Sequence, residues 1–313
     1  MNERELSEII IGESAAIREV RKQILRVAPA DVPVFLQGPT GTGKELIAQA
    51  LHQASGRHGK YVLFNACAIT ETMFEVTLFG QMKGAFTGAD ANKPGLLAEA
   101  DGGTIFFDEI CDLSHTLQPK LLRAVENKTY RSVGATSDRR SNFRLVSATN
   151  QHLRTLVDEG RFRADLAERL STFIIDVPPL AARLEDVPAI VQRFADEARR
   201  KSERELSLSK SAIRALQQYH WPRNVRELRN VVKRLFLMVD GSIAWPADVA
   251  NAIKMGTSDS WQVDENADIE RRALVGVLEG AGWSAEKAAE MMGVSRATVY
   301  RRMGKLGVRR KHR

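Results

Sequence analysis

Residues 31–55, DVPVFLQGPTGTGKELIAQALHQAS, constrain the fold of this chain more than any other stretch. An apolar run over 32–36 predicts a buried parallel strand, and the apolar spacing over 46–51 predicts a helix. Between them lie glycines that let backbone N–H groups converge on phosphate oxygens at the helix N-terminus: Gly38, Gly41 and Gly43. Lys44 adds a positive charge for the β- and γ-phosphates. The GxxxxGK spacing in this context favours a phosphate-binding loop over a plain glycine-rich turn.

A second strand signal, GGTIFFDEI, ends in two acids. The apolar run over 104–107 predicts a strand, so Asp108 and Glu109 fall at its carboxyl end, where α/β sheets bind their ligands. We expect Asp108 to hold Mg²⁺, mainly through water, and Glu109 to polarise the attacking water. The usual Ser or Thr after the phosphate-loop lysine is Glu45, so the metal must rely on other carboxylates, phosphates and waters.

A further strand signal, FRLVSATN, ends in two polar residues that could order the same water or the γ-phosphate: Thr149 and Asn150. The stretch EGRFRADLAERL then carries Arg161, Arg163 and Arg169. Arginines on a helix face are usually only solvated. A ring-forming ATPase, however, needs a cation delivered across the subunit interface, which is worth about 10³- to 10⁵-fold in rate.

Composition indicates an ordinary globular protein. The length of 313 residues suits roughly two domains. Of these residues 43% are hydrophobic and 27% are charged, which is ordinary for a globular protein. No apolar run approaches the roughly 18 residues of a membrane helix, and the opening MNERELSEII is charged where a signal peptide is apolar. The two cysteines, Cys67 and Cys111, lack metal-ligand spacing and suit a reducing compartment. We therefore expect a cytoplasmic protein with no membrane partner.

Positive charge is concentrated at the C-terminus, where eight Lys and Arg and no acid follow Glu290. In SAEKAAEMMGVSRATVYRRMGKLGV, Ala289, Gly293 and Val299 have helix-turn-helix spacing, with a small residue for close helix approach, a turn glycine and a core valine. The candidate DNA contacts lie on or beside the second helix: Arg296, Thr298, Tyr300, Arg301 and Arg302. A protein-docking helix pair is the alternative, disfavoured because the charge falls on the helix that would enter the major groove.

The remaining segments give the domain organisation. DVPAIVQRFADEARR and SAIRALQQYH have apolar spacing near the helical period, and Trp221-Pro222 breaks the chain before another helix. A polar stretch with glycine and serine then reads as a linker. The predicted domains are an α/β nucleotide-binding subdomain over 1–180, a helical lid over 181–253, a linker over 254–268 and a helix-turn-helix domain over 269–313.

Several motifs together carry a family resemblance. GPTGTGKE, LFGQMKGAFTGA, ADGGTIFFDEI, GRFRADLAERL and WPRNVRELRN occur in the order found in bacterial enhancer-binding proteins of the NtrC type, the AAA+ activators of sigma-54 RNA polymerase. The chain resembles these proteins over roughly residues 10–250, and its end resembles their Fis-type DNA-binding domain. The resemblance implies an α/β AAA+ P-loop ATPase, a parallel sheet flanked by helices, with a helical lid and a C-terminal all-α helix-turn-helix domain.

The resemblance also implies a function and partners. It describes an ATP-hydrolysing ring, a hexamer when active, that binds enhancer DNA and remodels the sigma-54 RNA polymerase closed complex. The GAFTGA loop would contact sigma-54 through Gly84, Ala85, Phe86, Thr87, Gly88 and Ala89. This explains a large apolar residue, Phe86, on a glycine-rich loop, where burial in its own subunit is the alternative.

Roles transfer from the family position by position. Asn65 resembles the asparagine that switches the catalytic glutamate, Arg163 and Arg169 match the trans-acting arginines, and Arg226 is similar to a nucleotide-sensing lid arginine. IIG at 10–12 falls where the adenine pocket begins. The implied nucleotide-binding set is Ile11, Gly12, Gly38, Pro39, Thr40, Gly41, Thr42, Gly43, Lys44, Glu45, Asn150 and Arg226, and the implied cofactors are ATP and Mg²⁺.

Departures from the family pattern leave the nucleotide chemistry intact. They are Val76, Thr77, Gln81, Met82, Ala167, Glu168, Ala181, Ala182 and Arg223. Most lie in loop, lid or interface segments. They could therefore change the coupling of hydrolysis to movement of the GAFTGA loop, or the ability of the chain to assemble without a partner. The runner-up interpretation is a DNA-bound regulator whose ATPase body is a nucleotide-controlled assembly switch that does not remodel sigma-54. A general unfoldase has no support, because no pore loop or substrate domain is evident.

The ATPase motifs begin within a few residues of the N-terminus, so we expect the chain to lack an N-terminal receiver or ligand-sensing domain. Control is then expected from expression level, a separate inhibitory protein or a co-activator, in a homo- or hetero-oligomer.

Overall fold

The computed structural model describes residues 1–66, 71–86, 89–202 and 205–256, and beyond them 274–275, 277–278, 281, 283–292, 294–305 and 308. Contacts divide the chain into two compact units, Met1–Ile11 with Ala15–Pro179 and Gly12–Ser14 with Leu180–Arg313. We call them the sheet unit and the lid unit. Within the described ranges, no helix combines the length and the apolar character that crossing a bilayer requires.

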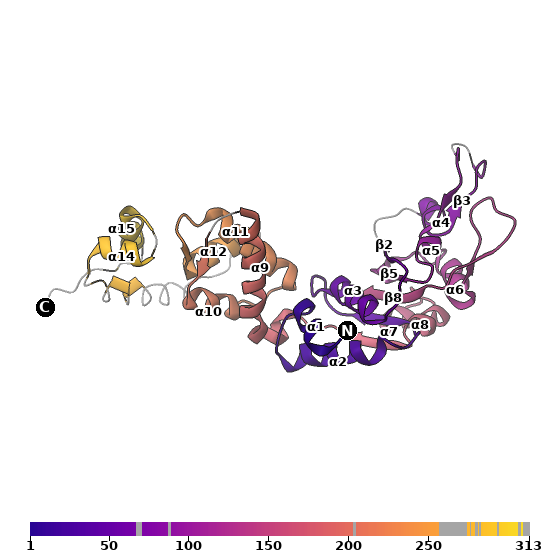
Figure 1. Ribbon diagram of the computed structural model, residues 1–313, viewed down its shortest axis with the longest axis horizontal. Coiled ribbons are helices and arrows are strands. Elements are labelled where there is room, and N and C mark those ends of the chain that lie inside the picture. The colour runs from indigo at the N-terminus through magenta and orange to yellow at the C-terminus, as the bar shows by residue number, and fades with distance from the viewer. Residues whose placement is uncertain are drawn as a thin grey trace. The chain divides into compact units, whose positions relative to one another are not determined.

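A parallel five-stranded sheet in the order β2-β5-β8-β1-β9 forms the centre of the sheet unit (Figure 1). Its strands are β1 Val34–Gln37, β2 Tyr61–Asn65, β5 Thr104–Asp108, β8 Arg144–Thr149 and β9 Phe173–Asp176. The described helices around it are α1 Glu3–Ile9, α2 Ala15–Val27, α3 Lys44–Ala54, α4 Glu71–Phe79, α5 Leu96–Glu99, η2 Ile110–Asp112, α6 Gln118–Asn127, α7 Leu153–Asp158 and α8 Ala164–Leu170.

The sheet has a separate core on each face. Successive residues of a strand point to opposite faces, so Phe106 packs with Leu6 and Ile47, whereas Phe107 packs with Leu121 and Leu166. All six residues of β8 are buried, as expected for a strand covered on both sides. The continuous apolar runs seen in the sequence are therefore the strands of a doubly covered sheet.

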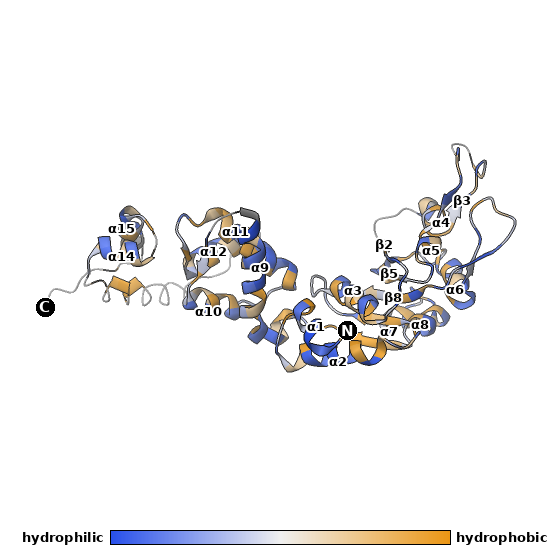
Figure 2. Cartoon of the chain, in the orientation of Figure 1, coloured by the Kyte–Doolittle hydropathy of each residue, from blue (hydrophilic) through white to orange (hydrophobic). Residues whose placement is uncertain are grey.

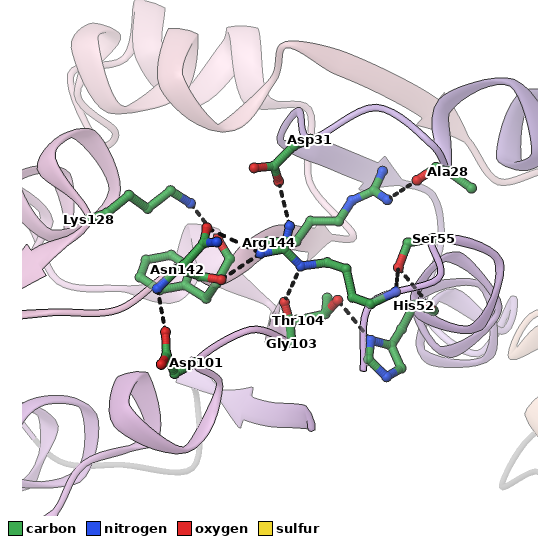
Figure 3. A network of polar contacts seen from close by, with 12 residues as sticks. Ala28, Asp31, His52, Ser55, Asp101, Gly103, Thr104, Lys128, Asn142 and Arg144 are labelled. Atoms are coloured by element: carbon green, nitrogen blue, oxygen red, sulfur yellow. Dashed lines mark hydrogen bonds and ion pairs between the residues drawn. The ribbon is translucent and has the colours of Figure 1, made fainter. Parts of the chain in front are cut away.

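A polar network fixes the amino ends of the strands to α2. Arg144 is 1% exposed at the start of β8, and its guanidinium donates to Ala28 O at 2.5 Å (Figure 3). It also donates to Val27 O at 2.9 Å. Val27 ends α2 and Ala28 follows it. Val27 O also accepts from Ala30 N at 3.1 Å, so the arginine adds a second donor there and caps the end of the helix. Arg57 donates to Gly103 O at 2.9 Å, just before β5. The network holds the edge of the sheet opposite to the carboxyl ends of its strands.

Two short antiparallel hairpins extend from the sheet unit. In the first, β3 Gly80–Gln81 pairs with β4 Lys93–Pro94, and in the second β6 Thr129–Tyr130 pairs with β7 Arg139–Arg140. Figure 1 shows that β3 and the loop after it project beyond α4 and α5, away from the sheet.

The lid unit is helical. Its described elements are η3 Leu180–Asp186, α9 Val187–Ser202, α10 Lys210–Gln218, α11 Asn224–Met238, α12 Pro246–Lys254, α14 Ala285–Met292 and α15 Arg296–Lys305, with a parallel pair of β10 Ser207–Leu208 and β11 Ile243–Ala244. Helices α9 to α12 carry hydrophobic and hydrophilic residues together, as amphipathic helices do (Figure 2). The chain breaks at Trp221-Pro222, as predicted, and α11 begins at Asn224. The parallel sheet, the lid helices and the C-terminal helix pair agree with the predicted fold class.

Candidate functional site

The phosphate loop lies between β1 and α3, as the sequence predicts. Helix α3 begins at Lys44, and its N-cap is Gly43 with φ 105°, in the left-handed region that favours glycine. A Cβ atom on Gly38 would lie 2.5 Å from Val177 O, so only glycine fits there. Backbone N–H groups at the start of a helix, beside a lysine, suit an anionic polyphosphate. The residues present therefore fit a bound nucleotide.

Lys44 and Glu109 meet at this loop. Lys44 is 6% exposed, and its Nζ donates to Gly38 O at 2.8 Å and lies 3.7 Å from Glu109 Oε1. Burial raises the pKa of Glu109, while Lys44 and the backbone N–H of Asn150 oppose the rise. The structure thus brings the predicted lysine and the predicted water-polarising acid together.

Asn150 joins the acid to the loop. Its backbone N–H donates to Glu109 Oε2 at 3.0 Å, and its side-chain Nδ2 donates to Thr40 Oγ1 at 3.0 Å. Thr149, its partner in the sequence prediction, is fully buried, and its hydroxyl accepts from Gln151 N at 3.1 Å. Of the two predicted polar residues, Asn150, which follows β8, is the one that reaches the phosphate loop.

The two acids differ in their backbone. Asp108 is the last residue of β5, and Glu109 follows it with φ 49° and ψ 46°, a left-handed conformation that is uncommon outside glycine. Such conformations persist where the surrounding structure holds them, often in active sites. Asn65 ends the neighbouring strand β2, opposite Asp108 in the parallel register. Its proposed switching of Glu109 stays a prediction.

The other predicted nucleotide residues have mixed surroundings. Pro39, Thr40 and Glu45 are exposed, whereas Gly12 and Thr42 are buried. Ile11 and Gly41 are half-buried. Arg226 is exposed on the first turn of α11 in the lid unit. Among the described residues, no group of three His, Cys, Asp or Glu is arranged to hold a metal ion.

The two predicted trans-acting arginines lie at either end of α8. Arg163 is its N-cap, and its guanidinium holds both carboxylate oxygens of Asp165, with Nη2–Oδ2 at 2.7 Å and Nε–Oδ1 at 3.0 Å. Arg169 is exposed, and its Nη2 is 3.5 Å from Glu126 O. Both positions leave the guanidinium groups at the surface of this chain.

The GAFTGA loop presents Phe86 to solvent. Phe86 is 46% exposed, and two backbone bonds join the described residues of the loop: Gly84 N donates to Ala89 O at 2.8 Å, and Ala89 N donates to Phe86 O at 3.0 Å. Ala85 is half-buried and Ala89 is buried. Thr87 and Gly88 lie outside the described residues. A buried phenylalanine, the alternative weighed from the sequence, is not what the structure shows.

The second hairpin braces the base of this loop. Met82 N donates to Val133 O at 2.9 Å, and Val133 N donates to Gly80 O at 2.9 Å. Gly134 has φ 80°, and a Cβ atom there would lie 2.6 Å from the Cβ of Ala85. Sequence reasoning missed this support. The only local signal was the glycine in SVGATSD, which indicates a turn but not its neighbour.

The predicted DNA contacts lie on α15. Arg296, Tyr300 and Arg301 are exposed, and the Arg296 guanidinium carbon lies 5.8 Å from the Tyr300 ring centre. Thr298 is half-exposed near the N-terminus of the helix. The predicted core residues Ala289 and Val299 are buried between α14 and α15. Gly293, the side chain of Arg302 and residues 257–268 of the predicted linker lie outside what the structure describes.

Comparison with protein-family models gives three matches along the chain. The sigma-54 interaction domain matches residues 10–176, the AAA+ ATPase lid domain matches 181–266, and the bacterial regulatory protein, Fis family, matches 267–306. The transcriptional regulatory protein ZraR of Klebsiella oxytoca is 38% identical over 307 residues, covering 95% of this chain and 68% of ZraR. The Nif-specific regulatory protein of Azotobacter vinelandii is 39% identical over 305 residues, covering 94% of this chain and 58% of that protein.

Solved structures give the same picture. NtrX from Brucella abortus in complex with ADP is similar with a TM-score of 0.71 at 32% identity, covering 97% of this chain and 72% of NtrX. The complex of NtrX with ATP has a TM-score of 0.69 at 33% identity, with the same coverage. A RuvB mutant from Thermotoga maritima, at 16% identity and a TM-score of 0.54, shares the fold alone. The predicted fold class, an AAA+ ATPase with a helical lid and a helix-turn-helix domain, is confirmed.

Proposed function

This chain belongs to the family of bacterial sigma-54 activators with a Fis-type DNA-binding domain, and from that premise we propose that it couples ATP hydrolysis in a ring to remodelling of the sigma-54 RNA polymerase closed complex. The ring would be a hexamer of this chain when active. It would act from enhancer DNA and contact sigma-54 through the GAFTGA loop. The observation that carries the proposal is the 46% exposure of Phe86 on a loop braced from the same unit that forms the phosphate site.

The nucleotide chemistry follows from four residues. The N–H groups of the phosphate loop and Lys44 would hold the β- and γ-phosphates. Mg²⁺, when bound, would neutralise charge that develops on the phosphates, and Asp108 would hold its water shell. Glu109 would accept the proton of the attacking water, and Asn150 would orient both Glu109 and the loop through the bonds described above.

The contact between Lys44 and Glu109 would change when ATP binds. Lys44 Nζ lies 3.7 Å from Glu109 Oε1. The γ-phosphate of ATP competes for that lysine, because a phosphate carries more negative charge than one carboxylate. Moving Lys44 to the phosphate would release Glu109 toward water. The same substrate would therefore fill the phosphate loop and free its base.

The loop and the DNA-binding helix should have separable roles. Phe86→Ala removes an exposed side chain of the loop, so we expect ATP turnover and DNA affinity within about 2-fold of the parent chain, as for most surface changes. Capture of sigma-54 should be lost. Arg301→Ala should instead spare ATP turnover and sigma-54 capture and weaken DNA binding by about 1 to 3 kcal/mol if the arginine reads a base.

The measurement is a matched set for both variants: ATPase rate, DNA affinity at two salt concentrations, and sigma-54 retention on beads. Met255→Ala serves as a control that also shortens an exposed apolar side chain, 66% exposed at the end of the lid helices. If Phe86→Ala stops hydrolysis or unfolds the protein, the phenylalanine has a structural role and the loop assignment is wrong. If Phe86→Ala still retains sigma-54, the loop is not the contact surface; if the parent chain retains no sigma-54 while nucleotide still controls assembly, the alternative of an assembly switch is favoured.

A further inference from the structure

Gln118 is a completely buried amide at the start of α6 in the sheet unit. It is 0% exposed and is the first residue of the helix. Its Nε2 donates to Leu113 O at 3.0 Å and to Arg161 O at 3.1 Å, while its Oε1 accepts from Arg163 N at 2.9 Å. A side-chain amide has two N–H donors and one acceptor oxygen. Gln118 therefore uses both donors and its oxygen on backbone groups.

The three backbone groups belong to two segments that are distant in the sequence. Leu113 follows η2, and η2 begins directly after Glu109. Asp112 N donates to Glu109 O at 3.0 Å, and Leu113 N donates to Ile110 O at 3.2 Å, so this turn also has backbone bonds of its own. The other two groups lie 43 and 45 positions beyond Gln118. Gln118 thus joins the turn after Glu109 to the start of α8.

The segment before α8 has an anchored backbone and an arginine that points outward. Phe162 is 2% exposed and belongs to the core of the sheet unit. Arg161 N and Phe162 N both donate to Leu156 O, at 2.9 Å and 3.1 Å. Arg163 follows as the N-cap of α8, with its guanidinium at the surface. Gln118 holds this backbone on both sides of Phe162, and so determines where the arginine side chain begins.

The position of Arg163 should be sensitive to this amide. Because Gln118 is completely buried, water cannot easily replace its bonds. A buried carbonyl or N–H that loses its partner costs the full desolvation of that group, so we expect the backbone to shift when the amide is removed. A misplacement of about 1 Å at a distance from the reacting atoms can lower a rate by about 10²-fold. An uncharged residue can therefore control how well a charged one acts.

We propose that Gln118 is a positioning residue for Arg163: it fixes the start of α8 so that the arginine reaches the nucleotide of the neighbouring subunit. The inference rests on the proposed function, because it takes the active form to be a ring in which Arg163 acts in trans. Gln118 itself touches no nucleotide and acts through the backbone of Arg161 and Arg163. The turn after Glu109 keeps its own backbone bonds, so the site within the same chain should stay intact.

The first experiment compares Gln118→Leu with Gln81→Leu in the full chain. Gln81 is a matched control because it is another buried glutamine of the sheet unit, 5% exposed, with its Nε2 3.4 Å from Ala91 O. We expect Gln118→Leu to lower ATP turnover at saturating ATP by about 10- to 100-fold. Its dissociation constant for methylanthraniloyl-ADP with Mg²⁺ should stay within about 3-fold of the parent chain. Gln81→Leu should leave both quantities within about 2-fold.

Mixing variants then identifies the subunit that carries the defect. Gln118→Leu keeps its phosphate loop, and Lys44→Ala keeps its arginines. In an equal mixture about a quarter of the interfaces join an intact loop to a well-placed arginine, so up to about a quarter of the parent turnover should return. Gln118→Leu mixed with Arg163→Ala should recover nothing beyond its residual turnover, because neither variant delivers the arginine well. Arg163→Ala mixed with Lys44→Ala is the reference pair.

Several results would overturn the proposal. They are unchanged turnover in Gln118→Leu, an equal loss in Gln81→Leu, recovery with Arg163→Ala, or no recovery with Lys44→Ala while the reference pair recovers. If Gln118→Leu does not fold, Gln118→Glu, which keeps the side-chain length and an acceptor for Arg163 N, is mixed with the same two partners and must give the same pattern. Failure of the reference pair to recover would instead contradict the shared site of the proposed function, and the inference with it.

Discussion

Glu109→Gln should abolish ATP hydrolysis while leaving ATP bound. Glutamine keeps the shape of the side chain and an acceptor for Asn150 N, but it removes the carboxylate that would take the proton from water. General bases contribute about 10²- to 10⁴-fold in rate, so we expect single-turnover hydrolysis to fall by about that factor. The dissociation constant of the nucleotide should change by less than about 3-fold, because the carboxylate is not proposed to hold the phosphates.

Asp108→Ala is the matched comparison. Asp108 ends β5 and is proposed to hold the metal, so its loss should abolish hydrolysis and also weaken binding of the magnesium nucleotide. Asp158→Asn, an exposed acid at the end of α7, should leave both quantities unchanged. Hydrolysis rates and nucleotide affinities with and without Mg²⁺ would check the assignment. An equal loss of affinity in the Asp108 and Glu109 variants would contradict the two separate roles.

Arg169→Ala and Arg163→Ala should each lower ATP turnover by at least about 10³-fold, the value of an arginine supplied across an interface. The parent chain should show turnover that rises faster than linearly with protein concentration until rings form. Arg163 now holds Asp165, an exposed pair worth little, so assembly can redirect it at small cost. Arg154→Ala removes another exposed arginine, on α7, and should have no effect.

A mixing experiment tests whether the site is shared between subunits. An arginine variant keeps an intact phosphate loop, and Lys44→Ala keeps intact arginines, so a mixed interface can combine the two intact parts. We expect part of the turnover to return when the two inactive variants are mixed. Turnover that is strictly linear in concentration, with no recovery on mixing, would place catalysis within one chain.

The sequence predicted those parts of the site whose residues are neighbours along the chain. The phosphate loop was evident because its glycines, lysine, strand and helix are adjacent in the sequence. Glu109 was identified as an acid after a strand, but its left-handed backbone and its bond from Asn150 N depend on packing between β5 and β8. Thr149 and Asn150 were predicted as a pair, and burial of the whole of β8 separates them.

Contacts between distant segments could not be predicted. Gln118 in HTLQPK has no local feature that connects it with Arg163, and Arg144 reads only as a polar interruption of an apolar strand. Leu46 fits the apolar spacing of α3 and yet is 43% exposed in a single chain. Its position is set by the geometry of the helix relative to the sheet, which the spacing alone does not specify.

The most direct measurement of the central claim is capture of sigma-54 by the parent chain in defined nucleotide states. Purified protein would be incubated with sigma-54 and no nucleotide, with ADP, or with ADP and aluminium fluoride as a mimic of the transition state. Because the account couples the Phe86 loop to the state of the γ-phosphate, we predict a stable complex only with the transition-state mimic. Ring assembly in that state without capture of sigma-54, or capture that is equal in all three states, would contradict the account.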